Sequence, residues 1–198
     1  MCVDVVATLE AASLLVPERA ATADDITVTD VWDYLAHDEW EVALDLLQEL
    51  RGAWTAPPGF WEELGRAAEM LGLERSREWC WWRSAETRVG VIRAELALDP
   101  AGVSFRRTPV PGAGVLRPMW DIGHRVEDGS SELDIARVWV EFAPDLPPGG
   151  RAAVRLLPLT PARWTHLGPG DRITMYECAV AGGSATILEV CPPVTLRP

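Results

Sequence analysis

The sequence predicts an α+β protein in which a small N-terminal helical bundle precedes a six-stranded antiparallel β-barrel. Apolar residues recur at three- and four-residue spacings between residues 29 and 88, and at two-residue spacings beyond residue 88. Residues 1–88 hold 7 Arg and 18 Asp or Glu, a net charge of −11, whereas residues 89–198 hold 11 Arg and 12 Asp or Glu, a net charge of −1. We therefore expect an N-terminal segment over 1–27 whose order the sequence leaves open, an acidic helical domain over 28–88, and a barrel over 89–198.

The acidic domain shows three or four short helical runs. In the first run, Val31 and Leu35 share one side of a helix that either Thr29 or Asp30 could cap. Pro57 and Pro58 separate the earlier runs from a later one that begins near Phe60.

Two stretches of this domain resemble helices of tetratricopeptide hairpins. They are DEWEVALDLL (38–47) and FWEELGRAAEMLG (60–72). No clean repeat period accompanies them, and a stable solenoid needs at least three repeats. We therefore expect a small bundle of helical hairpins.

Beyond residue 88, six apolar-alternating segments are separated by Pro- and Gly-rich turns. The candidate strands are VIRAELAL (91–98), VLRPMWDI (115–122), ARVWVEF (136–142), AAVRLLPL (152–159), DRITMYE (171–177) and SATILEV (184–190). Short strands without intervening helices predict an antiparallel barrel or sandwich, and closing the sheet removes exposed strand edges.

This half resembles the third, C-terminal β-barrel domain of bacterial elongation factor Tu. The motifs, in the family's order, are FRRTPVPGAGVLRPMW (105–120), LPPGGRAAVRLLPLTP (146–161) and PGDRITMYECAVAGGSATILEV (169–190). In that family the corresponding Arg-His-Thr-Pro turn helps to meet the tRNA backbone. The resemblance therefore implies a six-stranded barrel, with Arg106 and Arg107 as RNA contacts or as contacts between domains.

The chain departs from that family in ways that weaken a nucleotide or RNA function. It has no phosphate-binding GxxxxGK[ST] motif and no Lys at all, so a GTPase of that family is excluded. Phosphate affinity grows with the number of positive contacts, and two arginines beside a strongly acidic domain supply few.

The sequence predicts neither an enzyme nor a metal or cofactor site. Four cysteines are scattered without a CxxC pair: Cys2, Cys80, Cys178 and Cys191. No spacing offers a catalytic triad, and the histidines His37, His124 and His166 stand in separate segments. The one catalytic alternative left open pairs His124 with Asp121 or Glu127 as a base or a ligand.

We interpret the chain as a non-enzymatic interaction module, immunity- or antitoxin-like, whose acidic helical face binds a basic protein partner. The predicted partner-binding residues are Asp30, Asp33, Asp38, Glu39, Glu41, Asp45, Glu62 and Glu63. A solvated surface of an acidic protein explains the same residues, and a translation-linked accessory that binds tRNA or translation-factor partners through the barrel is the alternative function. The longest apolar runs are too short for a membrane helix, and Asp4 and Glu10 stand where a secretion signal carries positive charge, so a cytoplasmic location is expected.

Overall fold

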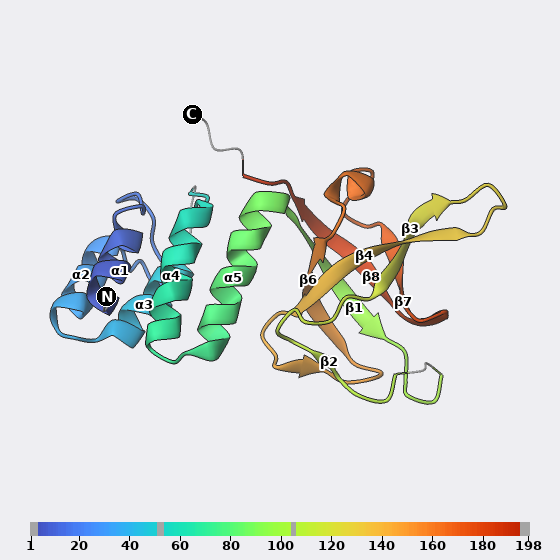
Figure 1. Cartoon of the computed structure of the whole chain (residues 1–198), viewed down its shortest axis with the longest axis horizontal. Helices are drawn as coiled ribbons and strands as arrows, with labels where there is room; N and C mark the ends of the chain where they lie inside the picture. Colours follow the sequence, from blue (N-terminus) through green and yellow to red (C-terminus); the bar gives the residue numbers. More distant parts are fainter. Residues whose placement is uncertain (1–3, 51–53, 104–105, 195–198) are drawn as a thin grey trace. The chain divides into compact units, whose positions relative to one another are not determined.

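A computed structural model describes residues 4–50, 54–103 and 106–194 and confirms the α+β class. Within these residues, five α-helices precede a closed barrel of six antiparallel strands (Figure 1). The chain divides into two compact units, a helical unit of residues 1–88 with 194–198 and a barrel unit of residues 89–193. Each unit has its own cluster of buried apolar side chains.

The helical unit contains α1 (Val5–Ser13), α2 (Val28–Ala36), α3 (Trp40–Glu49), α4 (Pro58–Met70) and α5 (Glu74–Val89). The first of these helices lies in the segment whose order the sequence left open; residues 1–3 of that segment are outside the described residues. The core of the helical unit contains Leu9, Leu44, Leu47, Phe60 and Leu64, which are all fully buried. These residues come from α1, α3 and α4, so the core joins the hairpins into one bundle.

The expected cap of α2 was wrong by two or three residues. Thr27, not Thr29 or Asp30, is the N-cap, and Asp30 is the third residue of the helix. The Thr27 backbone N–H and hydroxyl both donate to Asp30 Oδ2, at 2.7 and 2.8 Å. The Thr27 side chain also meets the Asp30 backbone N–H, so the two residues form a capping box. Val28, the first residue of the helix, is buried in the core.

The barrel unit contains the six strands that the alternation predicts. They are β1 (Val91–Leu98), β3 (Met119–Arg125), β4 (Ser131–Val140), β6 (Arg151–Pro158), β7 (Arg172–Glu177) and β8 (Val180–Cys191). Their order around the barrel is β1-β6-β4-β3-β7-β8, and β8 pairs with β1 to close it. Alternate residues face inward, among them Ile92, Leu96, Trp120, Val138, Leu156, Met175 and Ile187.

Three features of the barrel unit go beyond the predicted strands. A two-stranded sheet pairs β2 (Val110–Pro111) with β5 (Asp145–Leu146). Strands β3 and β4 continue past the barrel body as a hairpin (Figure 1), which turns where Val126 N–H donates to the Ser130 carbonyl. A 3-10 turn, η1 (Pro161–Trp164), follows β6 and inserts Trp164 into the barrel core.

Candidate interaction surface

Helices α2 and α3 form a hairpin that carries most of the predicted partner-binding residues. The two helices pack against each other (Figure 1). Their inward sides bury Val31 and Leu35 of α2 and Ala43, Leu44 and Leu47 of α3. The charged residues of both helices therefore remain on the outer side of the hairpin.

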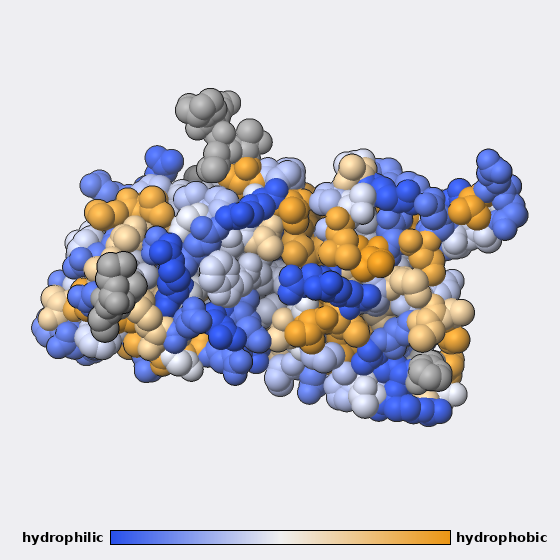
Figure 2. Space-filling model, viewed as in Figure 1, coloured by the Kyte–Doolittle hydropathy of each residue, from blue (hydrophilic) through white to orange (hydrophobic). Residues whose placement is uncertain are grey.

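Six exposed carboxylates on this hairpin make up what we call the α2–α3 acidic surface. They are Asp33, Asp38, Glu39, Glu41, Asp45 and Glu49. Among the residues that the structure describes, no arginine forms an ion pair with any of the six. Figure 2 shows mainly hydrophilic surface over the helical unit, interrupted by small hydrophobic areas.

Three of these carboxylates follow each other along one side of α3. Glu41, Asp45 and Glu49 are four residues apart, a spacing that brings like charges close on a helix. Partial burial, followed by the charges of Glu49 and Glu41, raises the pKa of the Asp45 carboxyl. Glu49 is the last residue of the helix, where the helix dipole disfavours a negative charge. Helix α3 therefore carries three negative charges that no arginine among the described residues neutralises.

Two apolar side chains are exposed on the same two helices. Trp32 on α2 is 37% exposed and Val42 on α3 is 41% exposed. Val42 follows Glu41 directly and lies on the same side of α3 as Asp45 and Glu49. Tryptophan is enriched at the energetic centres of protein interfaces, so the surface combines a charged field with an apolar anchor.

The remaining predicted partner-binding residues have local structural roles. Asp30 forms the α2 capping box, and hydrogen bonds from Thr27 hold the pKa of the Asp30 carboxyl below its usual value. On α4, Glu62 accepts from Ser84 Oγ at 3.2 Å and pairs with Arg88. Glu63 pairs with Arg66 at 2.5 Å. The structure therefore separates these three from the unpaired carboxylates of the hairpin.

The two arginines implied by the elongation-factor resemblance differ in their surroundings. The Arg106 side chain is 10% exposed, and its Nε lies 2.9 Å from both carboxylate oxygens of Glu177. Its Nη1 donates to the carbonyls of Thr108 and Pro109, at 2.9 and 3.0 Å. Arg107 is exposed and donates to the Ala101 carbonyl. Arg106 thus fastens its own turn to the end of β7.

His124 meets different partners from those considered in the sequence. Asp121 bonds Arg125, Ser131 and the Gly123 N–H rather than the histidine. His124 Nε2 lies 2.9 Å from the Arg163 carbonyl, and its ring lies 4.9 Å, centroid to centroid, from that of His166.

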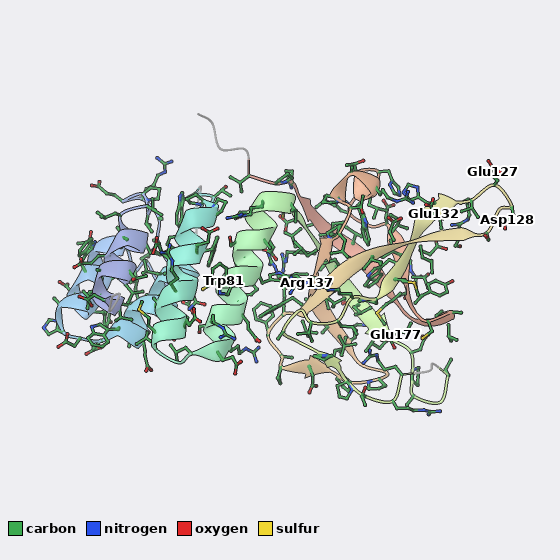
Figure 3. All side chains as sticks on the ribbon, viewed as in Figure 1. Trp81, Glu127, Asp128, Glu132, Arg137 and Glu177 are labelled. Atoms are coloured by element: carbon green, nitrogen blue, oxygen red, sulfur yellow. The ribbon has the colours of Figure 1, made fainter. Side chains whose placement is uncertain are left out.

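The other side chains at this end of the barrel come from β4 and η1. Arg163 Nε donates to Asp134 Oδ1 at 2.6 Å, and its Nη2 lies 2.9 Å from Glu132 Oε2. Figure 3 shows Glu132 on the β3–β4 hairpin, with Glu127 and Asp128 at the tip. Sequence spacing could not reveal this cluster, because the β3–β4 pairing and η1 bring its members together.

The described part of the chain has no cluster of candidate metal ligands, and its cysteines differ in exposure: Cys80 is buried and Cys178 is exposed. Residues 4–50, 54–103 and 106–194 contain no group of three or more His, Cys, Asp or Glu that could hold a metal ion. Burial raises the pKa of the Cys80 thiol to about 12. Cys2 lies outside the described residues. Within the same residues no helix is long and apolar enough to span a bilayer.

One member of the acidic surface escaped the sequence analysis. Glu49 carries the same four-residue spacing from Asp45 that Asp45 carries from Glu41, and this spacing could have identified it.

No protein-family model matches the chain, and no curated protein is significantly similar to it.

Proposed function

We propose that the protein is a non-enzymatic interaction module whose α2–α3 acidic surface binds a basic partner protein. An immunity- or antitoxin-like role, in which the surface covers the cationic substrate groove of a toxic enzyme, is the specific form of this proposal. The observation that carries it is that none of the six carboxylates has an ion pair among the described residues, on a hairpin that also exposes Trp32.

The contrast with three other carboxylates of the chain supports the proposal. Glu62 and Glu63 on α4 pair with arginines, and Glu141 in the barrel contacts two. Helix α3 instead keeps three like charges in sequence, one of them at the unfavourable end of the helix dipole. Residues that lower the stability of a fold without a structural benefit are typical of binding surfaces.

A basic partner would relieve this repulsion on binding. Opposite potentials accelerate the encounter of two proteins, and the acceleration falls steeply as ionic strength rises. Trp32 would then supply the desolvated apolar contact at the centre of the interface. The proposal therefore predicts fast, salt-sensitive association.

The translation-linked alternative receives less support from the barrel. RNA binding through the Arg106 turn needs donors that can reach phosphates, and the Arg106 guanidinium already contacts Glu177 and two carbonyls. Arg107 alone would supply a single exposed charge at this turn.

The test compares two variants with the same change in net charge. Glu41→Gln/Asp45→Asn neutralises part of the acidic surface, whereas Glu127→Gln/Asp145→Asn neutralises two exposed carboxylates of the barrel unit. Immobilised wild-type protein and both variants are used to capture proteins at low and moderate salt, and the rate of association of each captured protein is then measured.

We expect a basic protein that binds the wild type and the barrel variant equally, and associates at least tenfold more slowly with the acidic-surface variant at low salt. Equal weakening by both variants would mean that net charge alone acts, and no weakening by either would refute the proposal. Capture of RNA or translation factors that depends on Arg107 would favour the alternative.

A further inference from the structure

The end of the barrel beneath η1 contains four buried polar atoms that lack a hydrogen-bond partner among the described residues. One of them, Arg163 Nη2, lies 2.9 Å from Glu132 Oε2, whereas the other three have no such charged neighbour in the described part of the chain. These three are Trp120 Nε1, Trp164 Nε1 and Asp134 Oδ2. Trp120 is fully buried, and Trp164 and Asp134 are 2% and 6% exposed. Buried polar groups in native proteins almost always have a partner, so three at one end of a barrel call for a common explanation.

The strand register places two of these side chains next to each other. Trp120 of β3 is the direct cross-strand partner of Asp134 of β4. Both face the barrel interior, because the neighbouring residues Met119 and Ile135 alternate to the outside. Side chains of directly opposed residues on one face lie close enough to interact.

The third side chain reaches the same end from η1. Trp164 belongs to the barrel core and follows Arg163 in the chain. Arg163 Nε donates to Asp134 Oδ1 at 2.6 Å, which fixes the carboxylate and leaves Oδ2 without a protein donor. One oxygen of the carboxylate is therefore bonded by η1, and the other has no donor among the described residues.

The unpaired atoms match the hydrogen-bonding capacity of one water molecule. The two indole N–H groups can only donate, and Asp134 Oδ2 needs a donor. A water oxygen accepts two hydrogen bonds while one of its O–H groups donates, and buried waters typically make about three hydrogen bonds. The surrounding core residues Ile122 and Met175 are apolar and buried, which disfavours a larger polar ligand.

We propose that this end of the barrel binds one internal water molecule that accepts hydrogen bonds from Trp120 and Trp164 and donates to Asp134. The water joins η1 to the β3–β4 pair and completes the polar contacts that Arg163 begins. This site is independent of the α2–α3 acidic surface and of the proposed partner.

The test observes the indole N–H signals of the full-length, 15N-labelled protein by NMR. Trp120→Phe and Trp164→Phe each remove one indole signal while keeping an aromatic ring, and so assign the two signals. We expect both indole protons of the wild type to show cross-relaxation with water of the sign that marks a long-lived bound molecule.

Two substitutions separate the water from the ion pairs of Arg163. Asp134→Ala should reduce both water signals at least threefold, whereas Glu132→Ala, which removes the other carboxylate beside Arg163, should leave them unchanged. The wild-type spectrum decides even where Asp134→Ala fails to fold. Absence of the water signal at Trp120, or a direct hydrogen bond from Trp120 to Asp134, would overturn the proposal.

Discussion

Glu141 is a buried carboxylate held between two arginines on the barrel. Arg93 contacts both of its oxygens at 3.0 Å, and Arg155 Nη1 donates to Oε1 at 2.9 Å. The Glu141 side chain is 6% exposed, whereas Arg93 is 34% exposed and partly screened by solvent. We expect Glu141→Gln to lower the free energy of unfolding at pH 7 by about 2–3 kcal/mol, because it leaves two arginines without their shared anion. Denaturant titration measures this change.

The pH dependence of this loss follows from the pKa of Glu141. Burial alone would raise the pKa, but hydrogen bonds and charge from Arg93 and Arg155 hold it below its usual value. A lowered folded-state pKa stabilises the fold above the unfolded pKa of about 4.3, and this contribution is lost as pH falls through the folded value. The difference between wild type and Glu141→Gln should therefore shrink below about pH 4. Glu95→Gln, which breaks an exposed pair with Arg151, is the control and should cost under about 0.5 kcal/mol.

Arg106 offers a second test at the level of one side chain. Lysine keeps the charge but cannot contact both oxygens of Glu177 and two carbonyls at once. We expect Arg106→Lys to lower the free energy of unfolding by about 2 kcal/mol and to speed hydrogen exchange at residues 106–111. Arg107→Lys should change neither quantity. Unchanged exchange in Arg106→Lys would show that the turn does not depend on this guanidinium.

Among the helices, α3 allows the effect of charge position to be measured directly. Glu41 is in the first turn, where the helix dipole favours a carboxylate, and Glu49 is the last residue, where the dipole opposes it. We expect Glu49→Gln to raise the free energy of unfolding by about 0.5 kcal/mol and Glu41→Gln to lower it slightly. Denaturant titrations at low and high salt would measure both, and the difference should fade as salt screens it. Equal effects of the two substitutions would contradict this account.

Element type could be predicted from the sequence where apolar periodicity is strong. The alternation over 91–98 predicted β1 to the residue, because every second side chain there enters the core. The start of β3 was less predictable: the candidate strand began at residue 115, but the strand begins at Met119, after Pro118, whose backbone offers no N–H donor. The short β2–β5 pair has two residues in each strand, too few to produce a period.

The sequence could predict which acidic residues the candidate surface contains, but not which carboxylates form ion pairs. Residues 30–45 contain six acidic residues, so this segment carries a strong negative charge however its helices pack. That Glu62 meets Arg88, 26 residues away, depends on how α5 packs on α4, and no local spacing encodes it. The meeting of His124 with His166 likewise depends on the fold of the barrel.

Across the whole molecule, charge and hydrophobic core are distributed differently. Residues 1–88 carry −11 of the total net charge of −12. The buried apolar residues, in contrast, form a separate cluster in each unit. All six strands of the closed barrel lie within residues 89–193, so the sheet has no unpaired edge that another segment must cover. The strand pairing that closes the barrel and its buried cluster therefore both come from residues 89–193.

This leads to a prediction about the isolated barrel unit. We expect a fragment of residues 89–193 to fold, because its buried cluster, its sheet closure and the ion pairs of Glu141 all lie inside it. The fragment should give a dispersed NMR spectrum and a cooperative unfolding transition. Leu156→Ala, at a fully buried position, should lower the free energy of unfolding of the fragment and of the full chain by a similar amount, about 2–5 kcal/mol. A fragment that keeps β-structure but lacks dispersed signals and cooperativity would show that the barrel needs residues outside 89–193 to pack its core.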